Sequence, residues 1–540
     1  MNKIILMIIW HVLSAHAIFA FDRQDTLRGS NGRGRSWWDV QHYSLSVAFD
    51  TANKSISGSV AVRSKIVTAP TDSLQLDLQE PMILDSVVME GKRLTYSREG
   101  NAWWVKYPFH EFSPDGEFEF TAYYHGKPRE AKNPPWDGGF IWTKDSTGFT
   151  WIAVACQGLG ASSWWPWKDY QGDEPNSGME ILLEEDGGSD IVSNGTFEVS
   201  SCGSEGSSLA ILWHVINPIN TYNTTFYIGD YIVWTDTLMG EKGKLDLSFH
   251  ALRYNEAKAR KQFAVTKQML HCFEYWMGPY PFYEDGYKLV EAPYLGMEHQ
   301  SAVAYGNQYK MGYLGMDRSG TGVGLLFDFI IVHESGHEWF GNNITAQDVA
   351  DNWLHEGFTT YTEALFAECA FGKEKAFAYT MGKWNLINND KPVIGVYGVH
   401  EDGSGDMYNK GSAVVHMIRM VMNDDEQFRQ LLRGLNRDFY HKIVTSAQVE
   451  EYINKFAGYD FTPLFNQYLR GTDIPRLDWY VKKDRLHYRF KNVVEGFSLP
   501  LEITSGAVKE RIVVTGDWQS IKWKKGFDVS FQKGFLIKGL

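Results

Sequence analysis

Apolar and polar residues alternate along much of the chain between about residues 37 and 235. The alternation is clear over residues 43–49, 56–62 and 118–124, and Gly, Pro, Asp and Asn separate such runs. A period of two with turn residues between the runs is typical of strands that bury one face. The pattern therefore predicts a large, mostly antiparallel β domain over residues 37–235.

The period of the hydrophobic pattern changes near residue 254. Ala259, Phe263, Leu270 and Phe273 follow one another at helical spacing, and Gly278-Pro279 ends the run. A strand-like segment follows at 287–292, and further helical patterns continue to about residue 470. We expect a mixed α/β domain over residues 236–473.

Alternation returns after Ile474-Pro475. It is visible over residues 477–481, 486–490 and 499–503, with Gly between later runs. This pattern predicts a small C-terminal β-sandwich domain over residues 474–540. The whole chain is thus predicted to be a multidomain α+β protein.

The first residues have the pattern of a targeting segment. Lys3 precedes a largely apolar run from Ile4 to Leu13, and small residues follow up to Ala20. We interpret residues 1–20 as a secretory signal peptide, with an uncleaved anchor as the alternative, and residues 21–36 as a flexible linker. No later stretch reaches the roughly 20 apolar residues of a membrane span. We expect export to a periplasm or to the outside of the cell, without a stable membrane span.

Charge and cysteine content narrow the partners. The 540 residues include 52 basic and 66 acidic ones, a formal net charge of −14. Nucleic acids and anionic membranes need a basic face, so we expect neither as the main partner. Four cysteines could form two disulfides in an oxidising compartment, but their wide spacing identifies no pairing, and we expect buried thiols. They are Cys156, Cys202, Cys272 and Cys369.

One short stretch offers metal chemistry. His333 and His337 flank Glu334 in a segment that the preceding apolar residues predict to be helical. A four-residue step places both imidazoles on one helix face, where they can hold a single zinc ion. Glu334 lies beside the first histidine, placed to accept a proton from water. Taken singly, each of these residues would more often be structural.

A third metal ligand is available downstream. Eighteen residues, 338–355, separate the histidine motif from Glu356, and an amphipathic pattern after it predicts a second helix. Catalytic zinc sites keep three protein ligands and one open position. His333, His337 and Glu356 therefore form a complete candidate zinc site.

These two stretches together resemble the aminopeptidase N-like zinc metallopeptidases, which are gluzincins with a thermolysin-like catalytic domain. The resemblance implies such a domain over residues 236–473 and one zinc ion per chain, with Glu334 as general base. Many relatives add a helical domain after the β-sandwich. We expect no C-terminal helical domain here.

A second constellation resembles the exopeptidase motif of the same family. In Gly296-Met297-Glu298, the glutamate would pair with the α-ammonium of a peptide, and Gly296 and Met297 would line the substrate. Two positions depart from the family pattern: Leu295 stands where Gly is expected, and His299 where Asn is expected. These departures leave the exopeptidase assignment less well supported than the zinc site.

Two further residues take roles from the resemblance. Gln157, in Ala155-Cys156-Gln157-Gly158, would help to bind the N-terminal residue of the substrate. Tyr408, in a Tyr-x-Lys-Gly arrangement before a predicted helix, would stabilise the tetrahedral intermediate.

The resemblance implies a zinc-dependent aminopeptidase that removes the N-terminal residue of peptides by attack of a metal-activated water. Its substrates would be peptides or proteins with a free N-terminus. Two alternatives stay open. A thermolysin-like zinc endopeptidase shares the metal geometry, and an inactive peptidase-like binding protein shares the scaffold. Because all three metal ligands and the general base are present, an enzyme is favoured over an inactive binding protein.

Overall fold

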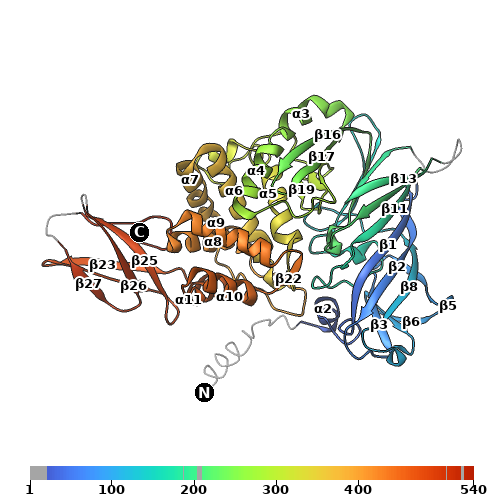
Figure 1. Cartoon of the computed structure of the whole chain (residues 1–540), viewed down its shortest axis with the longest axis horizontal. Coiled ribbons are helices and arrows are strands. Elements are labelled where there is room, and N and C mark those ends of the chain that lie inside the picture. The colour runs from blue at the N-terminus through green and yellow to red at the C-terminus, as the bar shows by residue number, and fades with distance from the viewer. Residues whose placement is uncertain (1–20, 186–187, 203–208, 506–507, 524–527, 540) are drawn as a thin grey trace, which may run out of the picture.

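The computed structural model describes residues 21–185, 188–202, 209–505, 508–523 and 528–539. The predicted signal peptide, residues 1–20, lies outside the described residues. Figure 1 shows strands at the N-terminal end of the described chain, helices in the centre, and a second group of strands at the opposite end. Within the described part, no helix is long and apolar enough to span a membrane. The arrangement is multidomain α+β.

The N-terminal domain is built on strands that the alternating pattern predicted. For example, residues 43–49 lie within β1 (Trp38–Asp50), in which Tyr43, Leu45 and Val47 are buried. β1 pairs antiparallel with β2 and parallel with β11. In the described residues, the largest sheet has the order β13 (Thr196–Cys202), β14 (Leu209–Val215), β11 (Met179–Glu185), β1, β2 (Ser55–Ile66), β8 (Glu117–Gly126), β4 (Ile83–Met89), β5 (Lys92–Arg93).

Two smaller sheets complete this domain. One has the order β12 (Asp190–Ser193), β15 (Phe226–Gly229), β10 (Thr150–Ala155), β9 (Gly139–Lys144), and the other β3 (Ser73–Asp77), β7 (Ala102–Lys106), β6 (Thr95–Glu99). β10 ends at Ala155, so the loop that carries Gln157 follows directly from a paired strand.

The segment 21–36, predicted as a flexible linker, instead contains a docked helix. Helix α2 (Arg23–Gly29) begins with a capping box formed by Asp22 and Asp25. Arg35, fully buried, forms an ion pair with Asp77. A Cβ at Gly29 would lie 2.1 Å from the backbone nitrogen of His400, so α2 packs directly against a loop of the central domain. The Arg-, Gly- and Ser-rich composition is typical of a flexible linker, and it carries no information about these specific contacts.

The central domain combines a mixed sheet with a bundle of helices. Its sheet has the order β16 (Tyr231–Gly240), β17 (Gly243–Leu252), β18 (Tyr287–Glu291), β20 (Val303–Tyr305), β19 (Gly296–Met297). The helices are α3 (Glu256–Phe263), α4 (Thr266–Met277), α5 (Phe329–Gly336), α6 (Trp353–Phe371), α7 (Lys373–Lys383), α8 (Asn409–Met422), α9 (Asp425–Asp438), α10 (Ser446–Ala457) and α11 (Thr462–Leu469). A short parallel pair, β21 (Ile344–Ala346) and β22 (Lys442–Val444), lies between them. β16 runs across the predicted domain boundary at residue 235.

A disulfide joins two helices of the central domain. Cys272 in α4 and Cys369 in α6 are bonded, and they lie 97 positions apart in sequence. The expectation of buried thiols is therefore wrong for this pair, because helix packing brings together cysteines whose spacing carried no signal. Cys156 is a free, buried thiol, and burial raises its pKa to about 12.

The C-terminal domain consists of two small sheets that pack on the helices. In the described part they have the orders β23 (Arg476–Lys482), β24 (Arg485–Lys491), β27 (Gln519–Lys522) and β26 (Val508–Thr515), β25 (Ser498–Ser505), β28 (Ser530–Phe531). Arg511 donates to the carbonyl of Val421 at the end of α8, at 2.6 Å. The Tyr468 hydroxyl donates to the carbonyl of Leu536 at 2.8 Å. This domain thus supports the helices behind the site.

Candidate metal centre

Two neighbouring helices carry the metal motif. Asp328 caps α5 by accepting from the backbone nitrogens of Ile330 and Ile331. Gly336 allows α5 to approach α6 closely, because a Cβ at this position would lie 2.4 Å from Oγ1 of Thr362. The glycine between the two histidines is therefore required by helix packing.

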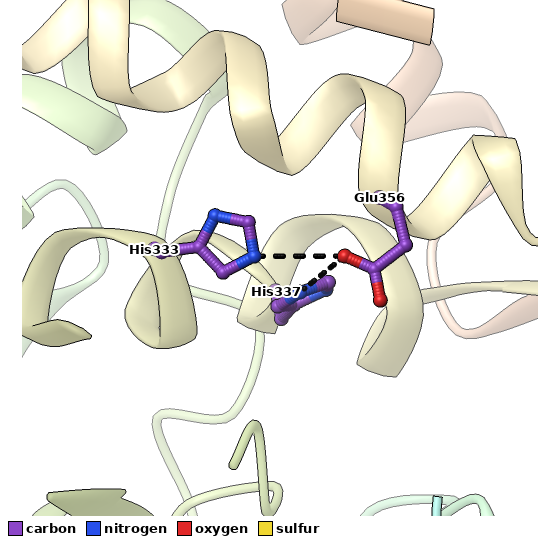
Figure 2. Close-up of side chains that lie close together, drawn as sticks. All are labelled: His333, His337 and Glu356. Atoms are coloured by element: carbon purple, nitrogen blue, oxygen red, sulfur yellow. Dashed lines mark ion pairs between the residues drawn. The ribbon is translucent and has the colours of Figure 1, made fainter. Parts of the chain in front are cut away.

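The side chains of His333, His337 and Glu356 meet at one point (Figure 2). Oε2 of Glu356 lies 3.5 Å from Nε2 of His333 and 3.3 Å from Nε2 of His337. Ligand atoms of a tetrahedral zinc with bonds of about 2.0–2.1 Å lie about 3.3–3.4 Å apart. All three side chains are buried. Their separations therefore match a zinc site.

The chemistry of the donors also fits a cation. Oε2 of Glu356 is buried and has no hydrogen-bond donor among the described residues. Burial lowers the pKa of His333, but the nearby carboxylates of Glu356 and Glu363 raise it to about 10. The site thus stabilises positive charge where the three ligand atoms converge. A divalent cation would satisfy the carboxylate oxygen that the protein leaves without a donor.

Each imidazole is oriented by a contact on its other nitrogen. Nδ1 of His333 lies 2.8 Å from Oε1 of Glu363. Nδ1 of His337 lies 3.0 Å from the carbonyl oxygen of Phe340. Such partners accept from Nδ1 and leave the Nε2 lone pair free for a metal.

A second set of three possible metal ligands includes His337 of this site. Glu298, Glu334 and His337 also bring ligand atoms within 4.8 Å of one another. However, Oε1 of Glu298 already accepts from Nε2 of Gln157 at 2.7 Å and from the Tyr222 hydroxyl at 3.1 Å. The trio with Glu356 is therefore the better metal site.

All nine residues singled out in the sequence line one cavity of about 720 Å³. They are Gln157, Gly296, Met297, Glu298, His333, Glu334, His337, Glu356 and Tyr408. The Tyr408 hydroxyl donates to Oε1 of Glu356 at 3.0 Å. Nε2 of Gln157 bridges Glu298 and Glu356, at 2.7 and 3.1 Å. Residues from both the N-terminal and the central domain therefore converge on the metal site.

Gly296 brings backbone close to the predicted base. A Cβ at this position would lie 2.8 Å from Oε1 of Glu334 and 2.7 Å from a side-chain carbon of Ile330. Any larger residue would occupy the space beside the carboxylate. Burial raises the pKa of Glu334 to about 7, which suits a group that accepts and returns a proton near neutral pH.

His299, which stands where the family has Asn, and His355, next to Glu356 in sequence, are buried and uncharged. Burial lowers the pKa of His299 and of His355 to about 3. Nδ1 of His299 lies 2.8 Å from the Tyr227 hydroxyl, and Nε2 of His355 accepts from the backbone nitrogen of Ala346 at 2.7 Å. They act as polar packing residues.

Four residues around the site escaped the sequence reasoning. Glu363 orients His333, Tyr222 donates to Glu298, and Arg318 and Asp402 line the cavity. Glu363 could have been found, because it stands seven residues after Glu356, two turns along the same helix. The others come from loops or from a distant domain, where spacing carries no signal.

The fold and the site together resemble those of a gluzincin-type zinc metallopeptidase domain. Residues 262–468 match the family described as Peptidase family M1 domain. The resemblance to aminopeptidase N-like zinc metallopeptidases is thus confirmed, and these matches indicate zinc as the metal.

Individual proteins show the same relationship. Aminopeptidase N of Lactococcus lactis subsp. lactis is 25% identical over 275 residues, which cover 45% of this chain and 32% of that protein. Leukotriene A-4 hydrolase of Xenopus laevis is 26% identical over 210 residues, which cover 36% and 33%. The chain thus matches about a third of the length of these curated relatives.

A solved structure extends the likeness beyond the matched domain. An M1 zinc metallopeptidase mutant from Deinococcus radiodurans, bound to a Tyr-Ser-Ala substrate, superposes with a TM-score of 0.67. It is 19% identical, and the match covers 83% of this chain and 97% of that one. At 19% identity, the comparison shows a similarity of fold alone.

Proposed function

We propose that this protein is a zinc-dependent aminopeptidase with a thermolysin-like catalytic domain. The observation that supports it most is the position of Glu298. Its carboxylate is buried within 4.8 Å of ligand atoms of Glu334 and His337, beside the metal site and in the same cavity. A peptide whose α-ammonium pairs with Glu298 would present its first carbonyl to the metal.

The backbone beside Glu298 supports the same orientation. β19, which contains Gly296 and Met297, lies at the edge of the central sheet, and both residues line the cavity. An extended peptide can pair with such an edge strand. Gln157 and Tyr222 hold the Glu298 side chain in place for the amine.

The roles of the side chains follow from the charges that develop during hydrolysis. His333, His337 and Glu356 would hold zinc, which supplies a Lewis acid that lowers the pKa of a coordinated water and polarises a carbonyl. Glu334 would accept the proton of the attacking water and return it to the leaving amine. The Tyr408 hydroxyl would donate to the oxyanion, and losing one such donor typically costs about 100- to 1,000-fold in rate.

Export is part of this proposal. A disulfide between Cys272 and Cys369 is typical of proteins in oxidising compartments. Together with the apolar segment at the start of the sequence, it supports a periplasmic or extracellular protein whose substrates are peptides with a free N-terminus.

A panel of aminoacyl p-nitroanilides tests the activity, with each substrate also prepared in N-acetylated form. We expect hydrolysis of the free amines, loss of activity with a chelator, recovery with zinc, and no hydrolysis of the N-acetyl forms. Equal rates on free and acetylated substrates would instead favour the endopeptidase. Zinc binding without any hydrolysis would favour the binding protein.

A further inference from the structure

The cavity contains one cation that the metal site does not use. Arg318 lines it and is exposed, and its guanidinium carbon lies 4.9 Å from the ring centre of Tyr313 and 5.8 Å from that of Phe329. Among the described residues, Arg318 has no hydrogen bond or ion-pair partner. Its neighbour Asp317 accepts instead from Ser319 and Gly322. Arg318 is therefore a positioned cation whose hydrogen-bond donors are free.

The other cation in the cavity is already neutralised. Nζ of Lys383 donates to Oε2 of Glu363 at 3.0 Å, and the same carboxylate orients His333. Lys383 thus belongs to the support of the metal ligand. A ligand carboxylate that enters the cavity would find its free partner in Arg318.

Arg318 and Glu298 lie toward opposite ends of one row of side chains. Phe329, His333 and His337 follow each other at four-residue intervals along α5, with ring centres 5.1 and 5.0 Å apart. Arg318 contacts the Phe329 end, whereas Glu298 lies beside His337. Eight residues of helix span about 12 Å.

We propose that Arg318 binds the α-carboxylate of short peptide substrates, and that the enzyme is selective for tri- and tetrapeptides with both termini free. The proposal rests on the proposed function, because it takes Glu298 as the site of the α-ammonium. An extended peptide advances about 3.3–3.6 Å per residue, so three to four residues match the roughly 12 Å of helix between Phe329 and His337. The planar guanidinium can bind a carboxylate through two parallel hydrogen bonds.

The direction of the bridge agrees with the chemistry. With the amine at Glu298, the first carbonyl lies at the metal ligands and the following residues run toward Phe329 and Arg318. The positive end of the zwitterion meets a carboxylate and its negative end meets a guanidinium. A peptide in the reverse orientation would place like charges together at both ends.

The test compares Ala-Ala-Ala and Ala-Ala-Ala-Ala as free acids with the same peptides as C-terminal amides. In the wild type, we expect kcat/KM to be about 10- to 100-fold higher for the acids, mainly through KM. Arg318→Met should lower kcat/KM for the acids to the value for the amides. Arg318→Lys should retain part of the difference in kcat/KM between acids and amides. A hexapeptide should show no such preference, because its carboxylate lies beyond Arg318.

Two controls separate this effect from general damage. Lys310→Met removes a positive charge from the same segment outside the cavity lining and should keep the preference for acids. Alanine p-nitroanilide, which has no carboxylate, gives a reference rate for each protein against which its preference for acids is compared. Calorimetric binding of the tripeptide acid and amide to zinc-loaded Glu334→Gln measures recognition without turnover, and the acid should bind about 10- to 100-fold more tightly.

Equal kcat/KM for acids and amides in the wild type would overturn the inference and leave the aminopeptidase intact. An equal fall in kcat/KM for acids and amides in Arg318→Met would likewise overturn the inference and leave the aminopeptidase intact. If no aminoacyl substrate is cleaved and neither peptide binds, the proposed function itself fails, and the inference fails with it.

Discussion

His333 illustrates how one metal ligand depends on residues around it. Its Nε2 faces Glu356, its Nδ1 contacts Glu363, and Glu363 in turn accepts from Tyr379 and Lys383. The sequence indicated the ligands because two histidines and two glutamates stood at zinc-site spacing. It did not indicate Lys383, because a lysine from a neighbouring helix has no fixed spacing to the site.

Replacing Glu363 by Gln tests this support. An amide presents a weaker acceptor to Nδ1 of His333 and leaves Lys383 uncompensated, so zinc affinity should fall about 10- to 100-fold. Competition with a fluorescent zinc chelator measures this affinity. Glu368→Gln, on the same helix but paired with Arg419, should leave zinc affinity unchanged. A Glu363→Gln protein that binds zinc as tightly as wild type would contradict the role of Glu363.

Glu334 should be needed for turnover and not for metal binding. Glu334→Gln keeps the size of the side chain but cannot accept a proton, so kcat should fall at least about 100- to 10,000-fold. Zinc content of the purified variant, measured by atomic absorption, should remain at one ion per chain. Near-normal kcat in this variant would exclude Glu334 as general base.

Helices α5 and α6 form the element on which the site depends. The apolar pattern and the amphipathic segment after Glu356 were sufficient to predict both helices. Their close approach was not predicted, because the requirement for Gly336 arises from Thr362 on the other helix. Likewise, Cys272 and Cys369 became a pair only once α4 and α6 were seen to pack together.

Gly336→Ala should destabilise this helix pair. The added methyl group would lie 2.4 Å from Oγ1 of Thr362, and overpacking of this kind typically costs about 1–3 kcal/mol. Urea denaturation of the zinc-loaded protein measures the loss. Gly516→Ala is a matched control, because its Cβ would meet only an ordinary contact at 3.5 Å. Equal stability of the two variants would argue against close helix packing at Gly336.

Across the whole molecule, the sequence predicted the three groups of elements and their order. Alternation of apolar and polar residues predicted the strands of the N-terminal and C-terminal domains, and helical spacing of apolar residues predicted the helices of the central domain. The resemblance placed Gln157 in the site, but Tyr222, also from the N-terminal domain, and Arg318, from a loop, were not predicted, because their spacing along the chain carries no signal. Helix α2 was also missed, because its contacts with the loop at His400 are specific to the fold.

Buried histidines make the stability of the molecule depend on pH. Burial lowers the pKa of His416 from 6.5 to about 3, between the rings of Tyr361, Phe377 and Trp384. Below pH 6.5 the unfolded chain binds a proton at this residue and the native state does not. The stabilisation from the neutral, buried His416 is therefore fully present above pH 6.5. As the pH falls from 6.5 toward 3, the free energy of unfolding decreases by up to about 1.4 kcal/mol per pH unit.

His416→Gln removes this linkage. Urea denaturation of wild type and variant at pH 7, 6, 5 and 4 should show a smaller loss of unfolding free energy for the variant as the pH falls. The difference should approach about 1.4 kcal/mol per pH unit below pH 6. Parallel pH profiles for the two proteins would show that His416 does not titrate in this way.

A time course of products from an unblocked tetrapeptide tests the account most directly. The zinc-loaded protein is incubated with the peptide, and mass spectrometry identifies each product as it forms. We predict loss of one residue at a time from the N-terminus, with no product formed after N-acetylation or with a chelator present. Cleavage at an internal bond, or release of the first residue from the acetylated peptide, would contradict an aminopeptidase built on Glu298 and the zinc site.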